Sequence, residues 1–117
     1  MTDQKVVLIT GASSGVGQAT ARLLSQKGYK VFGTSRNPSG AEPMPNVEML
    51  ALDVRDDDSV TACVKAVSDA TGHIDVLVNN AGYELAGALE ELSLDEAKVQ
   101  FETNFFGIIR MTKVVLP

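Results

Sequence analysis

A glycine-rich stretch close to the N-terminus has the residue types and spacing to bind a phosphate. Gly11, Gly15 and Gly17 follow the pattern G-x-x-x-G-x-G, directly after the apolar run Val6–Ile9 and at the start of a segment with helical periodicity. The first turn of a helix has free N–H groups and a partial positive charge, and small residues let a phosphate approach the backbone. The stretch therefore predicts a dinucleotide site, with the pyrophosphate over Gly15–Gly17. The candidate cofactor ligands in this stretch are Gly11, Ser13, Ser14, Gly15, Val16 and Gly17.

Apolar runs that alternate with helical patterns position this stretch within an α/β fold. The first run is continuously apolar, as expected of a central parallel strand that is buried on both faces. The segment 37–46 contains three prolines and a glycine, so it predicts a loop and not a crossover helix. The alternation predicts a Rossmann-like, doubly wound parallel sheet of about four strands, which forms a truncated dinucleotide-binding domain over residues 1–117. The expected strands are 6–9, 30–34, 47–52 and 75–79, and the expected helices begin near residues 16, 56 and 93.

The expected helices carry their own start and stop signals. Asp56–Asp58 favour the N-terminal dipole of the second helix, and Gly72 ends it. Ser93 and Glu96 have the spacing of a capping box, ahead of a short helix and then a longer one. The apolar positions are Val16, Ala19, Leu23 and Leu24 in the first helix, and Val60, Cys63, Val64 and Val67 in the second. Cys63 is therefore interpreted as a buried structural thiol.

The carboxyl ends of the four expected strands meet at one edge of the sheet, where such folds bind ligands. The stretch from Gly11 follows the first strand, and each of the other strands ends in a polar or glycine-rich cluster. These clusters predict further cofactor ligands along the same edge. The candidates are Ser35, Arg36, Asp53, Val54, Asn80, Ala81 and Gly82.

Arg36 predicts which dinucleotide is preferred. The end of the second strand is where an acidic residue would bind the ribose 2′-OH of NAD, but Ser35 and Arg36 stand there. A guanidinium matches the geometry of a phosphate, so NADP(H) is predicted over NAD(H). The alternative is a solvated surface arginine. Asp53 could accept a hydrogen bond from the adenine amino group, or act simply as a turn residue at the strand end.

The stretch from Gly11 to Gly15 also fits G-x-S-x-G, the nucleophile elbow of serine hydrolases. That mechanism needs a histidine within hydrogen-bond reach of the serine. The single histidine, His73, precedes the fourth expected strand and so lies at the opposite edge of the sheet, roughly 17 Å away. The hydrolase interpretation is therefore rejected.

Composition excludes several classes of function. The net charge of −5 and the pI near 4.7 argue against nonspecific binding to nucleic acid or to an anionic membrane. No apolar stretch reaches membrane-spanning length, and the N-terminus does not resemble a signal peptide. A lone Cys63 fits a reducing compartment and cannot build a metal site alone, so a cytoplasmic location without a metal is expected.

The motifs together resemble the classical short-chain dehydrogenase/reductase family. Thr10–Gly17 resembles that family's T-G-x-x-x-G-x-G cofactor motif, and Asp53 followed by Val54 resembles its adenine-binding pair. Asn79–Gly82 is similar to the N-N-A-G motif of the family, and Phe101–Asn104 to the segment whose asparagine belongs to the catalytic tetrad. The resemblance covers residues from about 5 to 117.

This resemblance implies hydride transfer between NADP(H) and a small-molecule carbonyl or alcohol. Arg36 resembles the basic residue of NADP-preferring members, and Asn104 would hold a water in the proton relay. The family also uses a serine and a Tyr-x-x-x-Lys pair, which this sequence lacks: glycine stands four residues after both Tyr29 and Tyr83, and no serine follows Asn104.

Two hypotheses follow from these departures. The first is the N-terminal part of a longer reductase, inactive as 117 residues alone. The second is a noncatalytic nucleotide-binding module, or a fragment that needs a partner to complete its sheet. The last helical segment resembles the one through which family members associate, so a homo-oligomer is expected in the full-length form. Its wide apolar face comprises Phe101, Phe105, Ile108, Ile109, Thr112 and Val115.

Overall fold

Strand β1 (Val6–Ile9) forms the centre of a parallel sheet. The structure, a computed structural model, describes residues 4–40, 42–81 and 93–116. In this part of the chain the sheet has four parallel strands in the order β3-β2-β1-β4. All of β1 is buried, as predicted for a central strand with both faces covered. The Rossmann-like parallel sheet predicted from the sequence is confirmed.

The other elements alternate along the chain, and the expected strand boundaries are correct to within one residue at each end. The loop predicted for 37–46 is also confirmed in its described residues, where a short 3-10 turn at Pro38–Gly40 is the one helical feature. The bounds are α1 (Gly15–Gln26), β2 (Lys30–Ser35), β3 (Val47–Ala51), α2 (Asp57–Thr71), β4 (Val76–Val78), α3 (Leu94–Phe101) and α4 (Gly107–Val115).

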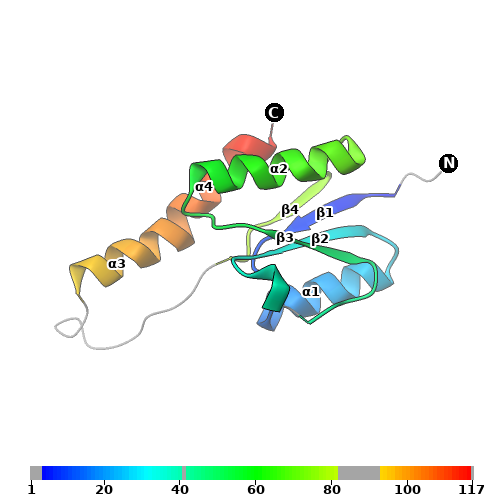
Figure 1. The fold of residues 1–117 in the computed structure, drawn as a ribbon, viewed down its shortest axis with the longest axis horizontal. Coiled ribbons are helices and arrows are strands. Elements are labelled where there is room, and N and C mark those ends of the chain that lie inside the picture. The colour runs from blue at the N-terminus through cyan, green and yellow to red at the C-terminus, as the bar shows by residue number, and fades with distance from the viewer. Residues whose placement is uncertain (1–3, 41, 82–92, 117) are drawn as a thin grey trace.

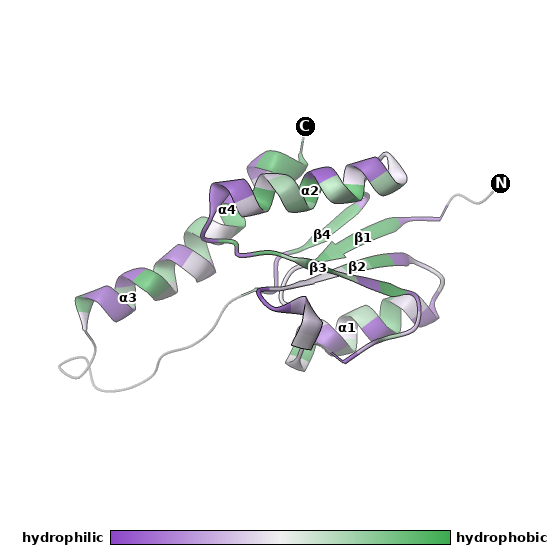
Figure 2. Cartoon of the chain, in the orientation of Figure 1, coloured by the Kyte–Doolittle hydropathy of each residue, from purple (hydrophilic) through white to green (hydrophobic). Residues whose placement is uncertain are grey.

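Side chains of β1 alternate between two cores, one on each face of the sheet. Val6 and Leu8 pack with residues of α2 and α4, whereas Val7 and Ile9 pack with residues of α1. Figure 1 shows the same layers, with α1 below the sheet and α2 and α4 above it. Figure 2 shows hydrophobic residues through the strands and over much of α4. Covering both faces leaves the ends of the strands as the places where a ligand can reach the sheet.

The predicted helix signals are confirmed at α2 and α3. Asp56 caps α2 by accepting a hydrogen bond from the backbone N–H of Asp58 (3.0 Å), and Gly72 ends the helix in the left-handed conformation (φ 83°). Ser93 and Glu96 form the capping box of α3. The four apolar residues expected on α2, including Cys63, are buried.

Helix α1 buries only part of the apolar face that was expected: Leu24 packs against the core on this side of the sheet, but the other expected positions are exposed. Val16 and Leu23 are 74% and 52% exposed, whereas Gly17 and Ala21 are buried. A Cβ added to Gly17 would lie 2.5 Å from Nδ2 of Asn80 and closer still to the carbonyl oxygen of Gly11. The helix approaches the sheet so closely that only small side chains fit between them, and residue size decides which face is buried.

The last segment is helical from α3 to α4, as expected, but the two helices are joined by a π-helical stretch, Glu102–Phe106, that the sequence pattern did not predict. Of the wide apolar face expected here, Phe101, Phe105, Ile108 and Ile109 are 40–62% exposed. Val115 of that face packs against the core, and the fully buried residues of α4 are Gly107 and Met111. Among the described helices, none combines the length and the apolar character needed to span a bilayer.

Substituting Gly17 and Gly15 separates steric collision from backbone strain. We expect Gly17→Ala to lower the free energy of unfolding by about 2 kcal/mol or more, because the added Cβ collides with backbone and with Asn80. Gly15→Ala is the matched control: Gly15 has φ 58° but open space around it, so the cost is about 1 kcal/mol of strain. Urea unfolding of the two variants measures both losses. Equal losses would contradict the close approach of α1.

Cys63 reports whether α2 is packed against the sheet. Burial raises the pKa of its thiol from 9.0 to about 11, so at mildly alkaline pH the reactive thiolate is about a hundredfold scarcer than in an exposed cysteine. We expect a thiol reagent to label the native protein more than a hundredfold more slowly than the protein unfolded in guanidinium chloride. Comparable labelling rates in the two states would show that α2 is not packed as described.

Candidate functional site

A cavity of about 600 Å³ lies beyond the carboxyl ends of β1, β2 and β3 and beside the residues that follow β4. Its volume is within the range of small-molecule sites. The residues at its wall come from all four of the strand-end clusters predicted from the sequence. The predicted ligands that line it are Gly11, Ser13, Ser14, Val16, Ser35, Arg36, Asp53, Val54, Asn80 and Ala81. Gly15, Gly17 and Asn104 do not line it, and Gly82 lies outside the described residues.

The turn between β1 and α1 presents the start of the helix to this cavity. Gly11 and Gly15 both have positive φ, 70° and 58°, a backbone conformation that favours glycine. Ser14 is the N-cap of α1, but its side chain makes no capping hydrogen bond. The first turn of α1 contains no acidic residue. The cavity wall here thus combines helix N–H groups with serine hydroxyls, a suitable environment for an anion.

Two buried threonines hold this turn to the neighbouring strands. The hydroxyl oxygen of Thr10 accepts hydrogen bonds from the backbone N–H groups of Asn80 (3.0 Å) and Ala81 (2.9 Å). Thr34 at the end of β2 accepts one from the N–H of Gly11 (3.2 Å). Nδ2 of Asn80 donates to the carbonyl oxygen of Gly11 (3.0 Å), so Asn80 fastens the strand end and lines the cavity at once.

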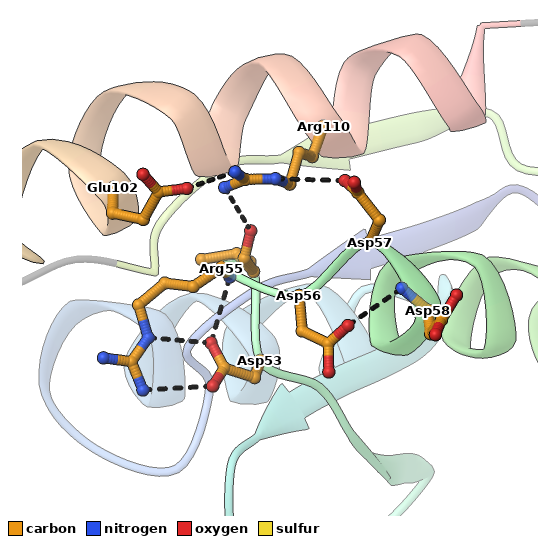
Figure 3. A network of polar contacts seen from close by, with 8 residues as sticks. Asp53, Arg55, Asp56, Asp57, Asp58, Glu102 and Arg110 are labelled. Atoms are coloured by element: carbon orange, nitrogen blue, oxygen red, sulfur yellow. Dashed lines mark hydrogen bonds and ion pairs between the residues drawn. The ribbon is translucent and has the colours of Figure 1, made fainter.

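Asp53 is paired with an arginine that the sequence analysis did not single out. Nε and Nη2 of Arg55 each donate to one carboxylate oxygen of Asp53, both at 3.1 Å, and the backbone N–H of Arg55 also donates to Oδ1 (3.0 Å) (Figure 3). The hydrogen bonds from Arg55 lower the pKa of Asp53 against the opposing effect of burial, and the charge of Arg36 lowers it further. Both members of the pair line the cavity. Their i, i+2 spacing after a strand end is the one sequence signal that could have revealed the pair.

Asn104 lies in the π-helical stretch between α3 and α4 and does not line the cavity. The neighbouring residue Thr103 does line the cavity. π-Helical turns interrupt longer helices and occur frequently at functional sites. The structure therefore brings the segment of Asn104 to the edge of the sheet that carries the other candidates.

Helix α4, which follows the π-helical stretch, is attached to the turn after β3 by two contacts. A Cβ added to Gly107 would lie 2.7 Å from Cγ2 of Val54, so the helix and the turn are closely packed. The guanidinium of Arg110 donates to Asp57 (3.1 Å), to the carbonyl oxygen of Val54 (3.4 Å) and to Glu102 (Figure 3). Sequence analysis predicted neither contact, because both join segments that are remote in the chain.

His73 lies at the opposite edge of the sheet from the cavity. Its Nε2 is 3.1 Å from Oδ2 of Asp75, and the same carboxylate oxygen accepts a hydrogen bond from the N–H of Val6 at the start of β1. The serines of the glycine-rich turn follow the far end of that strand. The structure therefore agrees with rejection of the serine-hydrolase interpretation.

Comparison with known proteins identifies the family. The sequence profile described as short chain dehydrogenase matches residues 5–117. The chain is 48% identical over 113 residues to a 3-ketodihydrosphingosine reductase of Bacteroides thetaiotaomicron, covering 97% of this chain and 41% of that protein. It is 41% identical over 117 residues to a 3-oxoacyl-(acyl-carrier-protein) reductase of Vibrio cholerae, covering 96% of this chain and 48% of that one. The chain thus spans somewhat less than half the length of these relatives.

Solved structures give the same result for the fold. A 3-ketoacyl-(acyl-carrier-protein) reductase from Brucella melitensis, complexed with NADH, superposes with a TM-score of 0.90 at 33% identity, over 97% of this chain and 49% of that one. ElxO with NADP bound superposes with a TM-score of 0.83 at 33% identity, over the same shares of the two chains. The chain belongs to the short-chain dehydrogenase family of oxidoreductases.

Proposed function

We propose that this chain is the cofactor-binding part of an NADP(H)-dependent oxidoreductase that interconverts a small-molecule carbonyl and an alcohol. The observation that carries the proposal is a single cavity whose wall contains both the start of α1 and Arg36. The relatives are reductases, and the two solved structures carry NADH and NADP, which supports a nicotinamide cofactor.

The glycine-rich turn fits the pyrophosphate of such a cofactor. Any side chain at Gly17 would collide with the turn, and a Cβ at Gly11 would lie 2.9 Å from Cα of Ala81. The backbone N–H groups at the start of α1, with the hydroxyls of Ser13 and Ser14, would bind the phosphate oxygens. Gly15, Val16 and Gly17 complete the proposed ligand set in this turn.

The ends of β2 and β3 fit the adenosine half. Ser35 and Arg36 would bind the 2′-phosphate, because a guanidinium forms two parallel charge-assisted hydrogen bonds with a phosphate. Asp53 and Val54 would hold the adenine ring, with a carboxylate oxygen of Asp53 accepting from its amino group. Asn80, Ala81 and Gly82 would line the remaining cofactor face. The preference for NADP(H) rests on Arg36, since the relatives include proteins with either cofactor.

The bound nicotinamide would supply or accept a hydride. Among the residues of this chain, Asn104 is proposed to hold a water that relays a proton, by resemblance to the family. The sequence contains no Tyr-x-x-x-Lys, so we propose that the 117 residues alone bind cofactor without turnover. A noncatalytic nucleotide-binding module is the second candidate, in which the same cavity would hold a nucleotide.

The exposed apolar residues of the last helical segment support association with a second copy in the full-length form. Phe101 and Phe105 contact each other edge to face with ring centroids 6.5 Å apart, and both are more than half exposed. Cytoplasmic location and the absence of nucleic-acid and membrane partners remain proposals that rest on charge, on the lone Cys63 and on the lack of an apolar spanning segment.

Replacing Arg36 tests the preference for NADP(H). We expect the protein to bind NADPH more tightly than NADH, and Arg36→Gln to weaken NADPH binding roughly ten- to a hundredfold, because a charge-assisted hydrogen bond is lost. NADH binding should change little. Fluorescence titration with each nucleotide measures both constants. Arg22→Gln, which removes the same charge from an exposed position on α1, is the control. Equal affinities of the parent protein for the two nucleotides would overturn the preference.

A turnover assay tests the proposal that the 117 residues alone are inactive. We expect the purified 117-residue chain to bind NADPH but not to oxidise it when carbonyl compounds are added, because the residues that would move the proton are not in the sequence. Absorbance at the nicotinamide band follows the reaction. Carbonyl-dependent oxidation by the 117 residues alone would contradict this expectation.

A further inference from the structure

We propose that Arg55 determines cofactor specificity by neutralising Asp53, so that the charge of Arg36 is available to the 2′-phosphate of NADP(H). This inference rests on the proposed preference for NADP(H) and adds a residue that acts through its neighbour. Arg55 is assigned a positioning role: it sets the charge of the site, whereas Arg36 contacts the phosphate.

The Asp53–Arg55 pair is held by three hydrogen bonds. Two run from the guanidinium to the two carboxylate oxygens, and one from the backbone N–H of Arg55 to Oδ1. The backbone N–H of Asp53 in turn donates to Oγ of Ser59 in α2 (2.9 Å). The side chains of Asp53 and Arg55 are 34% and 33% exposed, so most of the pair lies against protein. This geometry, visible in Figure 3, holds the guanidinium beside the carboxylate in a bidentate pair.

The charges that line the cavity show why such a pair matters. Among the described residues of its wall, the charged ones are Arg36, Asp53 and Arg55, which sum to +1 in a protein whose net charge is −5. Removing the charge of Arg55 would bring that sum to zero. Arg36 and Asp53 line the same cavity, and the charge of Arg36 also lowers the pKa of Asp53. An uncompensated Asp53 would therefore offset part of the attraction of Arg36 for a phosphate.

The charge of Asp53 has opposite effects on two parts of the proposed cofactor. The adenine amino group is best bound by an ionised carboxylate, whereas the nearby 2′-phosphate is repelled by it. The pair with Arg55 keeps Asp53 ionised for adenine and neutralises its charge toward the phosphate. A carboxylate has about four lone-pair sites, so Asp53 can accept from Arg55 and from adenine together. The site can therefore keep an aspartate for adenine without losing its attraction for a phosphate.

The ratio of NADH to NADPH dissociation constants tests this role, because any change in adenine binding affects both nucleotides and cancels. We expect Arg55→Gln to lower the ratio roughly threefold to tenfold, since the uncompensated carboxylate repels only the 2′-phosphate. Arg55→Lys keeps the charge and should retain most of the preference. The double variant Asp53→Asn/Arg55→Gln should recover the ratio of the parent. Arg22→Gln controls for loss of a positive charge elsewhere.

Each other result overturns a different claim. An unchanged ratio in Arg55→Gln would overturn the role of Arg55 while leaving the preference for NADP(H) intact. A lowered ratio that the double variant does not recover would show that Arg55 contacts the phosphate directly, which also overturns the neutralising role. A parent protein without preference would overturn the proposed function itself, and this inference with it.

Discussion

The close approach of α1 to the end of β1 is the constraint on which the rest of the structure depends. There is no room for a Cβ at position 17, so this residue must be glycine. In the same turn, the carbonyl oxygen of Gly11 accepts a hydrogen bond from Nδ2 of Asn80. Thr10 and Thr34 then attach the turn to β4 and β2. The ends of three adjacent strands are thereby held in one arrangement, and their residues form part of the cavity wall.

The same constraint explains which parts of the fold could be predicted from the sequence. The central strand β1 was predicted to the residue because a short, continuously apolar run is typical of a parallel strand that is buried on both faces. Capping residues located the starts of α2 and α3 for equally local reasons. The buried face of α1 was predicted only at Leu24, because packing near the turn selects small residues, whereas a hydropathy pattern gives most weight to large ones such as Val16 and Leu23.

The candidate site was also predicted only in part. Topology alone brings strand ends to one edge, so the clusters at Gly11, Arg36, Asp53 and Asn80 were expected together, and the structure places them around one cavity. The partners of these residues were not predicted. The hydrogen bonds from Arg55 to Asp53 depend on the turn that follows β3, and the hydrogen bond from Arg110 to Val54 joins residues 56 positions apart. Such contacts depend on the folded backbone, which a spacing pattern does not describe.

The turn after β3 connects the wall of the cavity to α4 and to the π-helical stretch. Asp53 and Val54 line the cavity from this turn, while Val54 also packs against Gly107 and its carbonyl oxygen accepts from Arg110. Arg110 further bonds to Glu102, the first residue of the π-helical stretch that contains Asn104. One turn therefore sets both the wall where adenine is proposed to bind and the position of the helix that carries the proposed catalytic asparagine. Movement of α4 relative to the sheet would displace both, because Val54 is common to the two contacts.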